Sequence, residues 1–504
     1  MAVDSKSLFT GAAIFAAILV GIIMAVSVTT NAAGGLAALV PLIAGILGIL
    51  AIVKPKAGLF GLAALVIWVD EFKRLAVYFG GADSTTVIQV LAMPFVVLAA
   101  LNVGYFLNIL WGRAKIDKVG VSIYAFATVI GVVVFVTAEG GVAERAQRAA
   151  SLAGYMALIP IAYAYLTDFD DWRKFFAFQV IMALPAAAWA IKQYHFGFDQ
   201  IEWTYARSGL SLTHYSQMVL AAEPRVFGFF GSAASLGCIA IYCAFSWWHA
   251  GRYPQKRLLW IIAAVILTAV LVESNQRTAL FYPLIVALAA FTFRRGITTL
   301  ALYLTAFGIF VVGIISSDYL LNEGIEDVNR SLATGNRWGD RVLNINTFSD
   351  RIRGWQRLKR AESWSLLGTT TASAASSQQS SAYNEDYNHD VINKILISYG
   401  VLGLLAVIIP AAAALSILHG TVLSKYNPGG SRDPAFALAL SLPMIGLSMI
   451  GGDNFSTNPI NLQIWTSFAG VLVVYKILKE TRVQRRMNAS IPESPPLTFS
   501  RQRI

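Results

Sequence analysis

The sequence predicts an all-α protein that crosses a membrane many times. Of its 504 residues, 56% are hydrophobic and only 13% are charged, whereas soluble domains carry about 25% charged residues. So few charges cannot cover the surfaces of several soluble domains, which excludes a cytosolic enzyme and a disordered regulator. Aromatic residues make up 12% of the chain, as expected for belts of Trp and Tyr at the two membrane interfaces.

Apolar runs of the required length recur along the chain. A hydrocarbon core of about 30 Å needs roughly 20 apolar residues in a helix. The first run is longer than the apolar core of a signal peptide, and another follows at once, so it is predicted to be an uncleaved span. About fourteen helices (12–14) are predicted, of which the third is the shortest, near residues 8–28, 33–53, 57–69, 86–110, 119–138, 150–166, 175–192, 226–247, 258–273, 278–293, 297–316, 391–418, 434–450 and 460–477.

Basic residues fix the predicted orientation. They occupy alternate short connections and the tail, at Lys54, Lys56, Arg113, Lys115, Lys118, Arg173, Lys174, Arg252, Lys256, Arg257, Arg294, Arg295, Lys425, Arg432, Lys476, Lys479, Arg482, Arg485 and Arg486. By the positive-inside rule these loops and both termini are cytoplasmic. The net charge of +11 therefore reflects topology, and no nucleic-acid partner is predicted.

The chain divides by hydropathy into four parts. Helices 1–11 are predicted over residues 1–316, a long outer loop over 317–389, three further helices over 390–480, and a disordered basic tail over 481–504. Shorter outer loops are predicted at 70–84, 139–149 and 194–224. Long polar segments on one side suggest that the protein works at the outer face.

Three polar clusters mark that face. Arg225 lies at the mouth of the eighth span in "AAEPRVFGFFGSAASLG", and Arg277 lies in a tight turn in "LVESNQRTALFYPL". His389 opens a span in "YNEDYNHDVINKILISYGVLGLL". Each alone also fits an interfacial anchor or a polar residue at a helix N-terminus. Ionisable residues are nearly absent from the predicted span centres, which disfavours a transporter.

Together, these motifs resemble the O-antigen ligase and O-antigen polymerase superfamily. The order is Arg-x-x-Gly-x-Phe-Gly, an Asn-x-Arg-x-x-Leu turn, a long outer loop, and Asn-His-Asp followed by Gly-x-x-Gly. Within the loop, "SDRIRGWQRLKRAESWSLLGTT" resembles the Arg-x-x-x-Trp helix of the family. The match covers roughly Arg225 to Gly403. Two departures are "FFGSAAS", which lacks Asn-Pro after the glycines, and "TTTASAASSQQSS", which replaces a Gly-x-Gly turn.

The resemblance implies a GT-C-like fold with a long periplasmic loop, in the bacterial inner membrane. The implied reaction transfers glycan repeat units from an undecaprenyl-diphosphate-linked donor to a saccharide acceptor at the periplasmic face, without a metal or cofactor. Polymerase of a surface polysaccharide is the preferred role, with a chain-length-regulating membrane protein as a further partner. A ligase that passes the glycan to lipid A-core or protein is the alternative, and a flippase or transporter is the rival of a different class.

The residues suit this chemistry. A diphosphate leaving group gains negative charge, and an Arg fork binds phosphate oxygens in bidentate fashion, so Arg225 and Arg277 are assigned to the diphosphate. His389 is assigned as the general base for the acceptor hydroxyl, since an imidazole titrates near neutral pH. Asp390 and Glu385 are close enough in sequence to orient it. His214, in the outer loop 194–224, is an alternative base.

A basic segment of the long loop has two interpretations. Residues 330–360 contain seven Arg and one Lys against two Asp, and Arg353, Arg357 and Arg360 share one face of a predicted helix. This helix is either a lid over the diphosphate or an amphipathic helix on anionic lipid. No metal site is predicted. Acidic residues such as Asp70 and Glu71 are isolated and lack metal-ligand spacing. Cys238 and Cys243 can form neither a disulfide framework nor a thiolate metal site.

Overall fold

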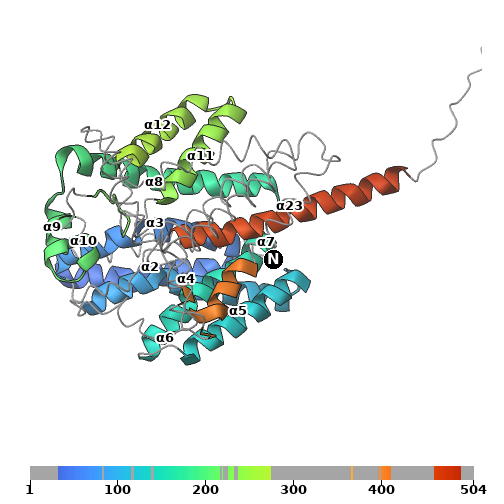
Figure 1. Cartoon of the computed structure of the whole chain (residues 1–504), viewed down its shortest axis with the longest axis horizontal. Helices are drawn as coiled ribbons and strands as arrows, with labels where there is room; N and C mark the ends of the chain where they lie inside the picture. The colour runs from blue at the N-terminus through green and yellow to red at the C-terminus, as the bar shows by residue number, and fades with distance from the viewer. Residues whose placement is uncertain are drawn as a thin grey trace, which may run out of the picture.

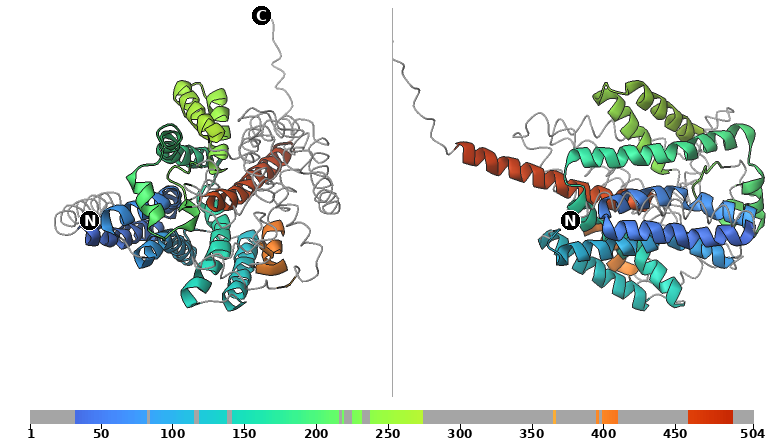
Figure 2. Two further views of the ribbon diagram at one scale, coloured as in Figure 1. Left: turned by 60° about the vertical axis from the view of Figure 1, so that its left-hand side comes forward. Right: turned by 180° about the vertical axis from the view of Figure 1, so that it is seen from behind.

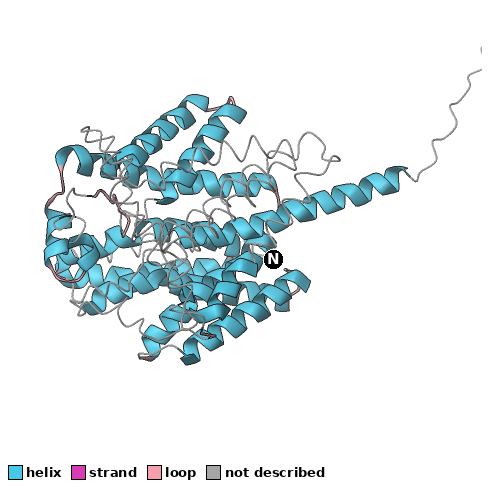
Figure 3. Ribbon diagram, viewed as in Figure 1, coloured by secondary structure: helices cyan, strands magenta, loops and turns pink. Residues whose placement is uncertain are grey.

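The computed structural model describes residues 32–81, 84–114, 118–137, 141–215, 218, 225–231, 237–273, 365–366, 395–396, 399–409 and 459–489. Every regular element in this part of the chain is a helix (Figures 1 and 3). The all-α prediction is therefore confirmed for the described residues. The predicted outer loop 317–389 lies outside them apart from 365–366.

Three helices near the N-terminus pack closely: α2 (Ala32–Val53), α3 (Pro55–Gly80) and α4 (Ser84–Leu110). Glycines allow their backbones to touch. A methyl group added at Gly58 of α3 would lie 2.5 Å from Ala51 Cα, and one added at Gly104 of α4 would lie 2.7 Å from Ala51 O. Small residues at such contacts are typical of helices that pack within a membrane.

The remaining helices build around this group. The labelled ones are α5 (Lys118–Thr137), α6 (Val142–Ala149), the π-helical turn η1 (Ala150–Gly154), α7 (Leu158–Tyr165), α8 (Phe169–Phe196), α9 (Gln200–Arg207), α10 (Leu212–Tyr215), α11 (Gly237–Arg252), α12 (Arg257–Glu273) and α23 (Ile460–Ala489). Residues 399–409 are also helical. The α11–α12 hairpin and the α5–α6 pair lie on opposite sides of the molecule (Figures 1 and 2).

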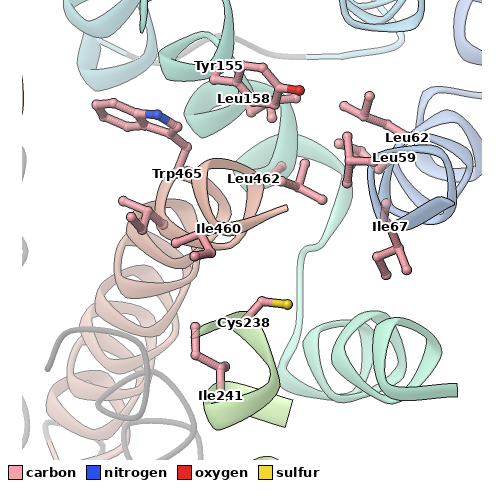
Figure 4. Close-up of a cluster of buried hydrophobic side chains, with 14 of the residues drawn as sticks. Leu59, Leu62, Ile67, Tyr155, Leu158, Cys238, Ile241, Ile460, Leu462 and Trp465 are labelled. Carbon is pink, nitrogen blue, oxygen red and sulfur yellow. The ribbon is translucent and has the colours of Figure 1, made fainter. Parts of the chain in front are cut away.

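One apolar core joins segments that are far apart in sequence. Trp465 and Leu462 of α23 lie with Leu158 of α7, Leu59 of α3 and Cys238 of α11 (Figure 4). All five are fully buried. The last described helix therefore packs into the N-terminal helices and does not form a separate domain.

Three helices in the described part are long and apolar enough to cross a membrane: Thr86–Leu110, Gly120–Thr137 and Asp170–Phe196. Their hydropathy supports a membrane protein. Shorter apolar helices at 42–53, 150–165, 399–409 and 460–473 also fall within predicted spans.

The structure corrects three predicted boundaries. Residues 70–80, predicted as an outer loop, continue helix α3, because acid–base pairs spaced three apart stabilise the helix. The eighth predicted span does not begin at residue 226, since 225–231 is not helical and α11 begins at Gly237. The basic tail, predicted as disordered from residue 481, first continues α23 to Ala489, where Lys, Arg, Gln and Glu favour helix.

Loops predicted on the same side meet at the same end of the bundle. At one end, Lys56 Nζ lies 2.6 Å from Asp171 Oδ1, and Lys476 lies over the ring of Tyr163. At the other, Tyr78 donates to Gln200 Oε1 over 3.2 Å. Figure 1 shows α9 and α10 at this second end, whereas α23 projects from the first. We call the α9–α10 end the outer end, following the predicted topology.

Cysteine labelling tests this topology. A membrane-impermeant maleimide is expected to label Ala375→Cys in intact cells, and Gln255→Cys only after permeabilisation, because the Lys/Arg bias places residue 255 inside. Gln255 is exposed, and the native Cys238 and Cys243 are buried, so background labelling is low. Labelling of both positions from the same side would contradict the span count and the assignment of an outer face.

Candidate functional site

Two of the predicted site residues, Arg225 and His214, fall in the described part of the chain. The others lie outside it, so the structure does not describe how they are arranged: Arg277, His389, Asp390, Glu385, Arg353, Arg357 and Arg360. The described part of the candidate site is therefore the part around Arg225.

Arg225 is the first residue of the described stretch 225–231, which is not helical and which we call the outer loop segment. Arg225 itself is exposed, whereas the next five residues are buried. The rings of Phe227 and Phe230 are almost completely inaccessible. Residues 226–230 of the segment are thus buried in the protein, whereas Arg225 is exposed and positively charged.

Arg74 of α3 holds this segment from one side. It is completely buried, and its Nη1 donates to Gly228 O over 2.9 Å while its Nη2 donates to Phe230 O over 3.3 Å. Its Nη2 also lies 3.2 Å from Glu71 Oε2, and its guanidinium lies 5.0 Å from the centre of the Phe227 ring. A buried charge is stable only when it is paired and hydrogen-bonded in this way.

Gln193 of α8 holds the segment from the other side. Its Oε1 accepts from the backbone N–H groups of Phe227 (3.0 Å) and Gly228 (2.9 Å). Its Nε2 donates to Glu202 Oε1 over 2.9 Å, and Trp189 Nε1 donates to the same oxygen over 2.6 Å. Burial raises the pKa of Glu202, and its contact with Asp199 raises it further.

Gly228 makes the close seating possible. Its φ of +57° lies in the left-handed region, and a Cβ at this position would lie 2.4 Å from Ala186 O of α8. Only glycine fits both constraints. At Gly231, a Cβ would lie 2.6 Å from Asp70 Oδ2, so the segment also packs closely against α3.

His214 lies behind the outer loop segment, with a side chain that is 1% exposed. Its Nδ1 lies 2.8 Å from Ser211 Oγ, and its ring contacts those of Tyr205 and Phe227 edge to face. Burial holds its pKa well below the usual range, and the charges of Lys73 and Arg74 lower it further. A general base must reach the proton that it removes, so the burial of His214 favours a packing role over the alternative-base role.

The charged residues of α3 were missed as a group by sequence reasoning. Asp70 and Lys73 form a close ion pair, as do Glu71 and Arg74, and all four side chains are buried. From the sequence alone, Asp70 and Glu71 are isolated acids in a predicted loop. The spacing of three residues between each acid and its base was the available signal.

The described residues offer no metal site, because no group of three or more His, Cys, Asp or Glu side chains among them lies close enough to hold an ion. A His–Glu contact does occur at the outer end, where His195 Nε2 lies 3.0 Å from Glu273 Oε1. The described part of the site is a backbone segment that is held by hydrogen bonds with buried side chains and that has one exposed arginine. An exposed arginine at a fixed position is suited to binding an anion.

No family model, no curated protein and no solved structure matches the chain.

Proposed function

We propose that the protein is a metal-independent membrane glycosyltransferase that polymerises undecaprenyl-diphosphate-linked glycan units at the periplasmic face of the bacterial inner membrane. Transfer of the same glycan to lipid A-core or protein is the alternative. Both reactions use one donor and one site, and they differ in the acceptor.

The observation that carries the proposal is the placement of Arg225. The first of three motifs that occur in the family order starts with this residue, and the structure holds its backbone segment rigidly while its side chain stays exposed. A lipid anchor needs a long flexible side chain but no fixed backbone. A group that stabilises a leaving diphosphate needs a fixed position.

The remaining chemistry follows from the motifs. Arg225 and Arg277 would bind the diphosphate as it departs with the electrons of the glycosidic C–O bond. The acceptor hydroxyl would attack the anomeric carbon and lose its proton to His389. Asp390 and Glu385 would orient the imidazole, and the basic face of Arg353, Arg357 and Arg360 would cover the donor or rest on anionic lipid.

A transporter remains the rival of a different class, and the buried charges of α3 bear on it. Charged residues inside a helical bundle often mark substrate or ion pathways. Here Lys73 is paired with Asp70, and Arg74 with Glu71 and two backbone carbonyls. Because these charges already have protein partners, they favour a structural role over transport.

Arginine-to-lysine substitutions test the proposal. In purified protein in lipid, supplied with the lipid-linked glycan of its source cells, Arg277→Lys and Arg225→Lys should each lower polymer formation about tenfold or more. Lysine keeps the charge but loses the fork, and one hydrogen bond to a charged group contributes about 1.5–3 kcal/mol.

Arg207→Lys is the matched control. Arg207 is also exposed at the outer end, where its guanidinium lies 5.1 Å from the centre of the Trp203 ring. This substitution should leave the rate unchanged. Wild-type rates in Arg277→Lys and Arg277→Ala alike would reduce Arg277 to an anchor and leave the diphosphate assigned to Arg225 alone.

A further inference from the structure

The proposed function uses Arg225 but not the two buried polar groups behind it. Arg74 lies 154 residues from Gly228 in sequence, and Gln193 lies 34 residues from Phe227. Their hydrogen bonds converge on backbone groups of Phe227, Gly228 and Phe230. Two separate helices therefore contribute buried side chains to the same short segment.

The hydrogen bonds leave this segment little freedom. Two consecutive N–H groups, at Phe227 and Gly228, donate to Gln193 Oε1. The carbonyl of Gly228 accepts from Arg74 Nη1 over 2.9 Å and from Gln193 Nε2 over 3.5 Å. Because the N–H groups of Phe227 and Gly228 are donors, only the amide oxygen of Gln193 can accept from them. Its amide nitrogen is in turn fixed by Glu202.

The hydrogen bonds of Glu202 help to hold the side chain of Gln193 in place. Glu202 accepts from Trp189 Nε1 and from the backbone N–H of Asp199, and with Asp199 it completes the capping box at the start of α9. Arg74 Nε donates to the carbonyl of Asp70 over 3.3 Å, and Arg74 Nη2 lies 3.2 Å from Glu71 Oε2. Each group that touches the segment is thus held by a second group.

We infer that Arg74 and Gln193 are positioning residues that hold the backbone next to Arg225, so that its guanidinium meets the lipid diphosphate at a fixed place. The inference rests on the proposed function of Arg225. A displacement of about 1 Å can lower a rate by about 100-fold. Neither residue touches the donor in this assignment, because both are buried.

A double-mutant cycle between Gln193 and Arg225 tests the inference. Gln193→Met removes the acceptor for two N–H groups and keeps the side-chain length. It should lower kcat/KM for the lipid-diphosphate donor about tenfold or more in the parent protein, but by less than about threefold in Arg225→Ala, because residues that act as one unit are not additive.

Gln179→Met is the matched control. Gln179 is a second fully buried glutamine of α8, and its Oε1 accepts from Tyr242 OH and not from the outer loop segment. Its substitution should change kcat/KM by less than about threefold in the parent protein. An equal loss in Gln179→Met and Gln193→Met would assign Gln193 to general stability and overturn the inference.

The outcomes separate the inference from the proposed function. If Arg225→Ala alone keeps full activity, the donor role of Arg225 fails. Two outcomes would overturn the positioning role while the donor role stands, provided that Arg225→Ala is impaired. In one, Gln193→Met lowers the activity of Arg225→Ala by the same factor as that of the parent protein. In the other, Gln193→Met changes the activity of neither protein.

Hydrogen exchange of the unmodified protein provides a second measurement, should Gln193→Met not fold. The N–H groups of Phe227 and Gly228 should exchange slowly, because both are buried and bonded to Gln193 Oε1. The amide of the exposed Gly209, in a turn at the same end, should exchange fast. Equal rates in the two segments would show that residues 225–231 are not held, and would overturn the inference.

Discussion

His389→Ala is expected to abolish polymer formation by the purified protein in lipid, while binding of the undecaprenyl-diphosphate donor survives. General-base catalysis contributes about 10²–10⁴-fold to a rate, whereas the donor is assigned to Arg225 and Arg277. The wild-type rate should also rise with pH between about 5.5 and 7.5, because only a neutral imidazole can accept the proton.

His195→Ala is the control for this experiment. His195 is half-exposed at the outer end and contacts Glu273, yet it is assigned no role in the reaction, so its loss should leave the rate near that of the parent. A His389→Ala protein that keeps more than about a tenth of the normal rate would exclude an essential base. The buried position of His214 makes it a poor substitute, so the diphosphate leaving group would then have to drive the reaction alone.

Gly104→Val is expected to disrupt the packing of α4 against α2. Even a methyl group at Gly104 would lie 2.7 Å from Ala51 O and from Ile52 Cα, and these are backbone atoms that cannot move aside without shifting the helix. Overpacking costs about 1–3 kcal/mol even where side chains can adjust, so we expect about 3 kcal/mol or more here. With an unfolding entropy of about 2.1 cal/mol/K per residue over 504 residues, the thermal midpoint of the detergent-solubilised protein should fall by roughly 3 °C or more.

Gly45→Ala separates this contact from the general effect of replacing a helical glycine. Gly45 lies in α2, the helix that Gly104 of α4 contacts, and a Cβ at Gly45 would meet no atom within 4 Å. Alanine favours helix over glycine by about 1 kcal/mol, so the midpoint should stay constant or rise. Equal midpoints for Gly104→Val and Gly45→Ala would show that α2 and α4 do not pack as described.

Hydropathy predicted most of the described helices, because an apolar run of span length has no other stable state in a bilayer. It failed where local and tertiary forces competed. In α3, four charged residues end the apolar run, yet the helix continues to Gly80 because the charges pair within it. Residues 226–231 are apolar but not helical, because Arg74 and Gln193 form hydrogen bonds with backbone groups that a helix would otherwise pair.

The candidate site was predictable only in part, for the same reason. Arg225 stood out because it is a cation next to glycines at a predicted outer boundary. The roles of Arg74 and Gln193 depend on partners 154 and 34 residues away, and no local pattern reports such contacts. Gly228 appears in the sequence only as one glycine of the Arg-x-x-Gly-x-Phe-Gly pattern, because its left-handed backbone and its contact with Ala186 O follow from the packing against α8.

The buried charges of α3 also have a consequence for synthesis at the ribosome. A buried charge is costly until it has a charged or hydrogen-bonding partner. The carbonyls that receive Arg74 lie 154 and 156 residues further along the chain. At about 5–20 residues per second they emerge roughly 8–30 s later. Until then, Arg74 has Glu71 and the carbonyl of Asp70 as its nearby partners in α3, so we expect α3 to stay at the translocon or the membrane surface until α8 and residues 228–230 have been made.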